Sequence, residues 1–380
     1  MKKDILMTCF LSLALTACQE DYNLNADFSL PTEFNSPSSI LLDVTSTTPI
    51  TLSWTGGGAA DGGIVLYEVL FDKEDGDFSE PLSVMKSNQG AMPSLSITHA
   101  AINTIARKAG IRPDETGTLK WTVNASKGGV VKRAEQVSSF TVTRGEGIDN
   151  IPQELFLYGN ATENSGQGGL AFRMVSEGIF QIYTTLSTGN IFFKSSTNAD
   201  AFSFYISDNG KLKEGEMKTD IEGIDGVARI TVDFNSLKMS LDEVQPTVRC
   251  IWGATYNDIA GLEYVGDGKF VGEGDIIFVD PSRPESNPPS WLGWTEERYY
   301  FIAVVNGTEV CWGRADDVSA ERPVGGEPDS FYSLYEYPWS QWDHLWKMSG
   351  NLDYKHATVT IDTNKNGLMI HTFTNVVSIN

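Results

Sequence analysis

The chain has 380 residues, with 28 lysines and arginines against 50 aspartates and glutamates, and its formal net charge is −22. Phosphate groups repel a chain this acidic, so neither nucleic acid nor an anionic lipid surface is expected as a partner. A neutral carbohydrate is not disfavoured by the charge. The length suffices for two to four domains.

The N-terminus has the pattern of a bacterial export signal. Lys2 and Lys3 precede an apolar run, 5–15, which is too short to span a bilayer. Small residues then lead to Cys18, and we expect cleavage to remove residues 1–17 and a lipid to be attached to the Cys18 thiol. Two or three acyl chains anchor a protein firmly, at about 0.8 kcal/mol per buried methylene. The sequence therefore predicts a lipoprotein that the membrane holds by its lipid anchor alone.

Polar residues and two prolines predict a tether over residues 18–37, and residues 38–147 predict an all-β domain. Short β-rich runs in this domain alternate apolar with polar residues between glycine-rich turns. The predicted strands are 40–44, 50–54, 66–71, 95–97, 119–123 and 137–142. One helix is expected to begin after Thr98 and to end before Gly110, with Ile102, Ile105 and Ala109 on one face.

Two tryptophans, Trp54 and Trp121, lie within predicted strands and are expected in the core, because β-sandwich cores commonly hold a large aromatic.

Several short motifs in this domain resemble the N-terminal domain of the SusE/SusF lipoproteins over about residues 26–145. They are Leu52-Ser53-Trp54, Tyr67-Glu68-Val69-Leu70-Phe71-Asp72, Gly76-Asp77-Phe78-Ser79-Glu80-Pro81, Ser96-Ile97-Thr98-His99 and Leu119-Lys120-Trp121-Thr122-Val123. The resemblance implies an immunoglobulin-like spacer domain followed by carbohydrate-binding modules. It also implies binding of starch at the outer membrane, beside a SusC-like transporter and a SusD-like binding protein. Gln19-Glu20-Asp21 resembles the surface-export signal of Bacteroides-type lipoproteins, which implies a position facing the cell exterior.

The remaining sequence contains a weak internal repeat, which predicts two β-sandwich modules of the carbohydrate-binding type over 148–245 and 246–380. Gly169 and Gly178 recur 92 and 90 residues later, whereas the motif 228–233 recurs 129 residues later. The second module is therefore expected to carry one insertion of about 35–40 residues. The first module has no tryptophan in the region after Gly159-Asn160-Ala161-Thr162, where SusE-like binding modules tend to carry one, so the resemblance implies a degenerate module that serves as a spacer. The fold class expected for the whole chain is all-β, in tandem sandwich domains.

Seven of the nine tryptophans lie between Trp252 and Trp346. Flat, stiff aromatic rings can bury the apolar face of a sugar while neighbouring polar groups bind its hydroxyls. The candidate carbohydrate-binding residues are Trp291, Trp294, Trp312, Arg314, Trp339, Gln341, Trp342, Asp343 and Trp346. The alternative is a core stripe, because Trp339, Trp342 and Trp346 would share one face if their segment were helical.

Three other features of the sequence concern cysteine pairing and metal binding. Cys250 and Cys311 could form a disulfide or be two buried thiols. Asp362 begins a segment like a calcium loop, but a hairpin turn through Asn366-Gly367 fits it better. No metal site or cofactor is expected.

The sequence thus predicts a surface glycan-binding lipoprotein without catalytic activity that supplies oligosaccharide or polysaccharide to an uptake complex. Two rivals stay open: a glycoside hydrolase, since 50 acidic residues can always supply two carboxylates, and an adhesin that binds a protein through the aromatic segment.

Overall fold

The structure is a computed structural model that describes residues 25–145, 147–315 and 322–379. The predicted signal peptide and Cys18 lie outside the described residues. No helix in the described ranges has the length and apolar character needed to cross a membrane. The chain divides into two compact units, each treated by itself. The first comprises the residues up to Ser39, Ile50–Ile97 and Thr118–Thr141, and the second comprises Ile40–Pro49, Thr98–Gly117 and the chain from Val142 onward.

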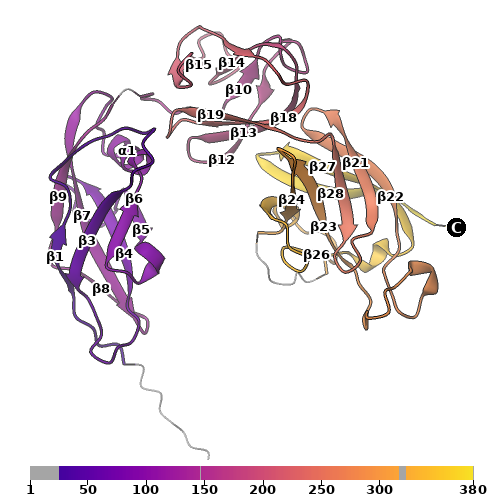
Figure 1. Cartoon of the computed structure of the whole chain (residues 1–380), viewed down its shortest axis with the longest axis horizontal. Coiled ribbons are helices and arrows are strands. Elements are labelled where there is room, and N and C mark those ends of the chain that lie inside the picture. The colour runs from indigo at the N-terminus through magenta and orange to yellow at the C-terminus, as the bar shows by residue number, and fades with distance from the viewer. Residues whose placement is uncertain (1–24, 146, 316–321, 380) are drawn as a thin grey trace, which may run out of the picture. The chain divides into compact units, whose positions relative to one another are not determined.

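The strands of the N-terminal region form two antiparallel sheets (Figure 1). One sheet has the order β1-β3-β6, and the other has the order β2-β9-β7-β4-β5, with β8 also paired to β7. The strands are β1 (Pro31–Asn35), β2 (Ser39–Leu41), β3 (Ile50–Gly56), β4 (Leu66–Lys73), β5 (Ser83–Lys86), β6 (Ser94–Ile97), β7 (Thr116–Lys127), β8 (Val130–Arg133) and β9 (Ser138–Thr143), with the 3-10 helix η1 (Asn88–Gly90) between β5 and β6. All six strands predicted here are present.

Trp54 and Trp121 lie in the core of the first unit, as predicted, with 3% and 0% of their surfaces exposed. Phe34 stacks on the Trp121 ring, with 4.7 Å between the ring centroids. Phe34 belongs to β1, which pairs with β3. The prediction that residues 18–37 are all tether is therefore wrong at its C-terminal end. One aromatic contact and one ladder of backbone hydrogen bonds hold Pro31–Asn35 in the domain despite its polar composition.

The one α-helix within the described residues, α1 (His99–Lys108), belongs to the second unit. The Thr98 hydroxyl accepts a hydrogen bond from the Ala101 backbone N–H and caps the helix. Ile102, Ile105 and Ala106 form its buried face. The predicted cap is confirmed, and Ala106 is buried in place of Ala109, which was predicted to lie on that face.

The first module is a pair of sheets around one apolar core, in which Phe180, Phe193 and Ile230 are fully buried. One sheet has the order β11-β10-β14-β15-β16, with β17 also paired to β14, and the other has the order β12-β13-β18-β19. The strands are β10 (Phe156–Tyr158), β11 (Leu170–Ala171), β12 (Arg173–Ser176), β13 (Ile179–Leu186), β14 (Gly189–Lys194), β15 (Ser203–Ile206), β16 (Leu212–Glu214), β17 (Thr219–Ile221), β18 (Gly226–Asp233) and β19 (Lys238–Glu243).

The second module is one antiparallel sheet of nine strands that curls around its core, because strands from both ends of the sheet contribute to the same apolar cluster. Its order is β25-β24-β23-β20-β21-β22-β27-β28, with β26 also paired to β23. The elements are β20 (Thr247–Trp252), β21 (Asp258–Gly266), β22 (Lys269–Ile276), η2 (Pro284–Ser286), β23 (Arg298–Val305), β24 (Thr308–Gly313), η3 (Asp329–Tyr332), β25 (Tyr335–Pro338), β26 (Trp346–Lys347), η4 (Gly350–Leu352), β27 (Lys355–Lys365) and β28 (Leu368–Ser378). The prediction of an all-β chain of tandem sandwich domains is confirmed.

The two modules share one topology, which accounts for the weak repeat in the sequence. The order β12-β13-β18-β19 recurs as β21-β22-β27-β28, and the order β10-β14-β15 recurs as β20-β23-β24. The extra residues of the second module are not one insertion, as the sequence predicts, but two. One is 277–297, between β22 and β23, and the other lies between β24 and β27. The predicted domain boundaries at 147/148 and 245/246 stay predictions.

Cys250 and Cys311 are both buried and unpaired. Cys250 lies opposite Phe301, and Cys311 lies opposite the next residue, Ile302. Because successive side chains on a strand point to opposite faces, the two thiols are on opposite faces of the sheet. Of the two alternatives left open by the sequence, buried free thiols is the one the structure supports.

Candidate functional site

The two inserted segments of the second module meet at a groove of about 680 Å³. The turn after β20 forms one side of it, and the two insertions form the rest. The lining residues are Ala254, Thr255, Tyr256, Asn257, Asn287, Pro288, Pro289, Trp291, Gln341 and Trp342. A volume of this size is typical of small-ligand sites, and we call this site the aromatic groove.

Four exposed tryptophans lie in or beside the aromatic groove. Trp291, Trp294, Trp339 and Trp342 keep 54, 45, 46 and 43% of their surfaces exposed. The Trp291 ring lies 6.0 Å from that of Trp294 and 6.5 Å from that of Trp342, the latter nearly perpendicular at 84°. Trp339 packs against Tyr256 at 5.7 Å. Large rings that pack against one another and still face water form an exposed apolar patch, and such patches commonly mark binding sites.

A buried ion pair supports two of these rings from below. The Glu296 side chain is fully buried and accepts hydrogen bonds from the Arg298 guanidinium at 2.7 and 2.5 Å and from the Trp294 indole N–H at 3.0 Å. The guanidinium lies 5.8 Å from the Trp294 ring and 5.2 Å from the Trp342 ring. The Glu296 carboxylate raises the pKa of Arg298, so the cation is permanently charged beneath both rings. One side of each ring is therefore occupied by the protein.

The loop that carries Trp291 and Trp294 is closed at its base. Backbone hydrogen bonds join Val279 to Glu296, and the Thr295 hydroxyl donates to the Asp280 carboxylate at 2.6 Å. The Ser282 hydroxyl also donates to that carboxylate, and hydrogen bonds from Ser282 and Thr295 together lower the pKa of Asp280 to about 2. The loop is thus fixed at both ends by charge-assisted hydrogen bonds.

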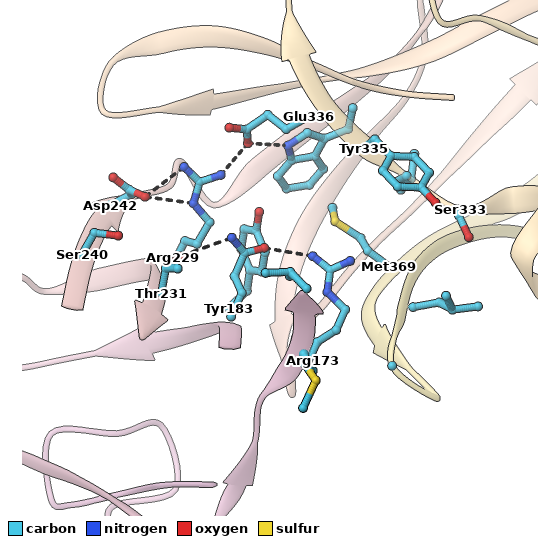
Figure 2. Close-up of a pocket in the computed structure, with 17 residues that line it drawn as sticks. Arg173, Tyr183, Arg229, Thr231, Ser240, Asp242, Ser333, Tyr335, Glu336 and Met369 are labelled. Carbon is cyan, nitrogen blue, oxygen red and sulfur yellow. Dashed lines mark hydrogen bonds and ion pairs between the residues drawn. The ribbon is translucent and has the colours of Figure 1, made fainter. Parts of the chain in front are cut away.

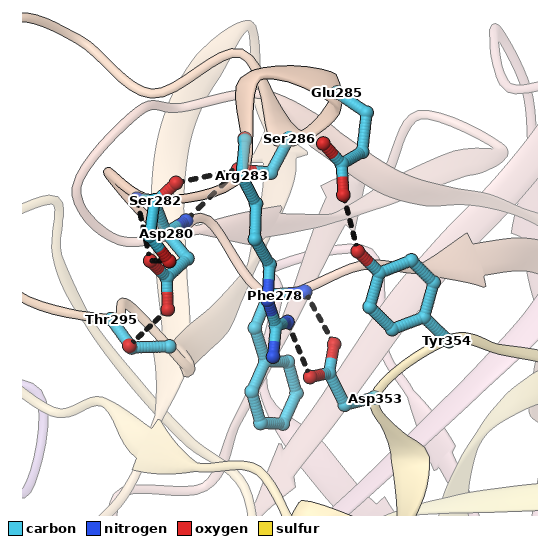
Figure 3. Close-up of polar contacts among 9 residues, drawn as sticks. All are labelled: Phe278, Asp280, Ser282, Arg283, Glu285, Ser286, Thr295, Asp353 and Tyr354. Carbon is cyan, nitrogen blue, oxygen red and sulfur yellow. Dashed lines mark hydrogen bonds and ion pairs between the residues drawn. The ribbon is translucent and has the colours of Figure 1, made fainter.

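A second set of contacts ties the middle of this loop to the residues before β27 (Figure 3). Arg283 pairs with Asp353 at 2.6 Å, and the Tyr354 hydroxyl donates to Glu285 at 2.5 Å. The Arg283 guanidinium also lies 5.2 Å from the Tyr354 ring. A loop held in this way loses little conformational freedom when a ligand binds, which favours affinity.

Several polar groups at the aromatic groove have no partner among the described residues. Hydrogen bonds are made by the indole N–H groups of Trp294 and Trp339, but none by those of Trp291 and Trp342. The side-chain amides of Asn257, Asn287 and Gln341 are also without partners in the described ranges. These groups offer both donors and acceptors beside flat rings.

Of the predicted site residues, three line the aromatic groove: Trp291, Gln341 and Trp342. Trp294 adjoins it through the Trp291 ring, and Trp339 adjoins it through Tyr256. The helical face considered for the tryptophans of this segment does not form, because Tyr335–Pro338 and Trp346–Lys347 are strands with bends between them.

Two predicted site residues, Trp312 and Trp346, are core residues instead, with 0 and 1% of their surfaces exposed. Both lie on the inner face of the curled sheet, where they contact the apolar cluster. Neither indole face is exposed at the aromatic groove, so the prediction that these two residues form part of that aromatic surface is wrong.

Arg314 and Asp343 do not line the aromatic groove either. The Arg314 backbone exchanges contacts with His344, its N–H donating to the His344 carbonyl oxygen at 2.9 Å and its own carbonyl oxygen lying 3.1 Å from the His344 Nδ1. The Asp343 carboxylate accepts a hydrogen bond from Ser340 at 2.5 Å.

The sequence interpretation missed Tyr256, Asn257 and Asn287. Tyr256 ends the repeat motif 251–256, and its position at a turn between two strands was the available signal. Neither asparagine stands out in the sequence, because only the folding of the two insertions brings them beside the tryptophans.

The fold and the site define a multidomain all-β protein with an exposed aromatic groove. Comparison with known families matches residues 19–124 to the family described as SusE outer membrane protein. The resemblance predicted from the sequence motifs is therefore confirmed for the N-terminal part of the chain.

The chain was also compared with curated proteins and with solved structures. Curated proteins give no match. Among solved structures, the crystal structure of SusF from Bacteroides thetaiotaomicron is similar at 13% identity and a TM-score of 0.25, covering 91% of this chain and 100% of that one. A score this low supports no argument about the present chain.

Proposed function

We propose that this chain is a lipid-anchored, non-catalytic glycan-binding protein of the outer membrane, facing the cell exterior beside a SusC/SusD-like uptake complex. The observation that carries the proposal is the aromatic groove, in which the Trp291 and Trp342 rings adjoin three free side-chain amides. Indole rings cover the apolar face of a pyranose, and amides bind its hydroxyls. The SusE family match gives the class of protein and the outer-membrane location in which such a groove would be used.

The lining of the aromatic groove also argues against the glycoside hydrolase alternative. Hydrolysis of a glycosidic bond needs two carboxyl groups on either side of the bond. None of the described residues that line the groove is an aspartate or a glutamate. Release of reducing sugar from any polysaccharide, abolished by changing one acidic residue, would contradict the proposal.

Binding at an open groove by stacking should be weak, with dissociation constants in the millimolar to micromolar range, or about 4–8 kcal/mol. Affinity electrophoresis on gels loaded with neutral polysaccharides would identify the glycan, and calorimetry with its oligosaccharides would give the affinity. Removing one stacking ring should cost about 1.5 kcal/mol, a loss of about tenfold. We expect this loss for Trp291→Ala and for Trp342→Ala.

Phe202→Ala is the matched control, because Phe202 is an aromatic residue of the first module with 51% of its surface exposed, away from the aromatic groove. It should leave binding unchanged. An equal loss in all three variants, or retention of binding in both tryptophan variants, would rule out the groove as the site. Recovery of an outer-membrane protein, with no glycan bound, would favour an adhesin instead.

A further inference from the structure

A second cavity, of about 540 Å³, lies in the second unit between the sheet β12-β13-β18-β19 and the segment around β25 (Figure 2). It has no lining residue in common with the aromatic groove. Its walls hold two arginines and several hydroxyl groups, whereas no described residue that lines the aromatic groove is charged. We call it the arginine pocket.

One of the two arginines, Arg229, is fully neutralised. Its guanidinium pairs with Asp242 at 2.9 Å and with Glu336 at 2.6 Å (Figure 2). Glu336 also accepts a hydrogen bond from the indole N–H of Trp312 at 3.1 Å. The two carboxylates at the pocket are therefore already engaged, and these three charged side chains carry a net charge of −1 between them before any other group is considered.

The other arginine, Arg173, has no carboxylate partner in the described part of the chain. Its only hydrogen bond there runs from Nη2 to the amide oxygen of Gln181, at 2.9 Å. The Nε atom is buried and has no partner at all. Burial lowers the pKa of Arg173, yet a guanidinium stays protonated at neutral pH. Among the described residues, Arg173 thus keeps a partly buried charge that no carboxylate contacts directly.

Such a group is costly, because a charge removed from water needs a partner of opposite charge or several hydrogen bonds. The planar fork of a guanidinium matches a carboxylate best, with two parallel N–H···O contacts. In Arg173 the Nε atom is buried and Nη2 already donates to Gln181, so an anion that enters the pocket would supply the carboxylate that this guanidinium lacks among the described residues.

The groups around Arg173 indicate what could carry that carboxylate. The hydroxyls of Thr231, Ser240 and Ser333 line the same cavity, together with the half-exposed ring of Tyr335 (Figure 2). Hydroxyl groups bind the hydroxyls of a sugar, and a tyrosine ring can cover a sugar face. We propose that the arginine pocket binds a uronic acid residue of a glycan, with its carboxylate on Arg173 and its hydroxyls on the surrounding side chains.

This site is separate from the proposed neutral-glycan site, so the two can be tested independently. Calorimetry and ligand-observed NMR on the purified full chain, at pH 7 and low salt, would compare glucuronate and galacturonate with glucose and galactose. We expect binding of a uronate and at least tenfold weaker binding of the matching neutral sugar. A neutral sugar that binds as well as its uronate would overturn the proposal.

Two additional ligands test the chemistry. Acetate supplies the carboxylate without the sugar and should bind at least tenfold more weakly than the uronate. A sulfated monosaccharide supplies a tetrahedral anion and should also bind more weakly. Equal binding of acetate would mean a general anion site, and tighter binding of the sulfated sugar would mean that the carboxylate is the wrong group; either result overturns the uronate assignment.

Arg173→Gln should weaken uronate binding at least tenfold, and Arg173→Lys, which keeps the charge without the planar fork, should weaken it less. Trp342→Ala, which alters only the aromatic groove, should leave it unchanged. Circular dichroism would verify that each variant is folded, and the lysine variant keeps the test open if the glutamine variant does not fold. Unchanged uronate binding in folded Arg173 variants, or its loss in Trp342→Ala alone, would refute the proposal.

Discussion

Replacing Trp346 by alanine separates the core tryptophans from those of the aromatic groove. Trp346 has 1% of its surface exposed. Its ring stacks on Tyr299, with 6.0 Å between centroids, and lies 4.5 Å from the His371 ring. Its indole N–H donates to the Phe331 carbonyl oxygen at 3.4 Å. Truncation would remove all of these contacts and leave a cavity.

The expected cost follows from the buried area. A tryptophan side chain buries about 200 Å², and at about 25 cal/mol per Å² this corresponds to about 5 kcal/mol. Truncations of buried tryptophans typically cost about 3–5 kcal/mol. We therefore expect Trp346→Ala to lower the free energy of unfolding of the second module by about 3–5 kcal/mol.

Urea unfolding monitored by hydrogen exchange would measure this loss, since exchange reports on the second module separately from the other domains. Trp342→Ala is the control and should lower the free energy of unfolding by only about half as much, because 43% of the Trp342 surface is already exposed. The reasoning fails if Trp346→Ala leaves stability intact and removes glycan binding instead.

Three further outcomes are expected. Burial lowers the pKa of His371 from 6.5 to about 3. Between these two pH values the unfolded chain binds a proton that the folded chain does not, so the free energy of unfolding should fall by about 1.4 kcal/mol for each pH unit below 6.5. In unfolding titrations of His371→Gln, the free energy of unfolding should therefore fall less steeply with decreasing pH than in the wild type. Burial raises the pKa of both Cys250 and Cys311, so neither should react with a thiol reagent until the protein is unfolded, and a reaction in the native state would contradict their placement. Glu296→Gln weakens the support of Trp294 and should reduce glycan affinity several-fold; the same affinity with an unchanged near-ultraviolet spectrum would show that the ion pair does not position the ring.

Patterns within a few residues of each other were enough to predict much of the fold. Thr98 caps α1 as expected, and the turn through Asn366 and Gly367 joins β27 to β28 with both residues at positive φ. The alternation of apolar residues located the six strands predicted in the N-terminal region. Capping, turn chemistry and side-chain alternation all act over one to four residues, so a single sequence contains them completely.

The same local patterns gave wrong predictions for residues whose structure depends on pairing between strands far apart in the chain. Pro31–Asn35 has a polar composition, but its pairing with β3 makes it a strand. Trp312, Trp342 and Trp346 are identical in residue type, and the sequence treated them alike. Strand register places Trp312 and Trp346 on the inner face of the curled sheet, whereas Trp342 lies on a bend at the aromatic groove.

By itself, the sequence determined the all-β class, the tandem modules, the resemblance of the N-terminal region to the SusE family and the concentration of aromatic residues in the second module. Only the tertiary structure decided which of those rings face water, that the extra residues form two segments meeting at one groove, and that Arg173 lacks a carboxylate partner in the described residues. The physical reason is that the exposure of a ring and the pairing of a charge depend on neighbours from strands far apart in the chain. A one-residue change of strand register would turn each side chain to the opposite face of the sheet.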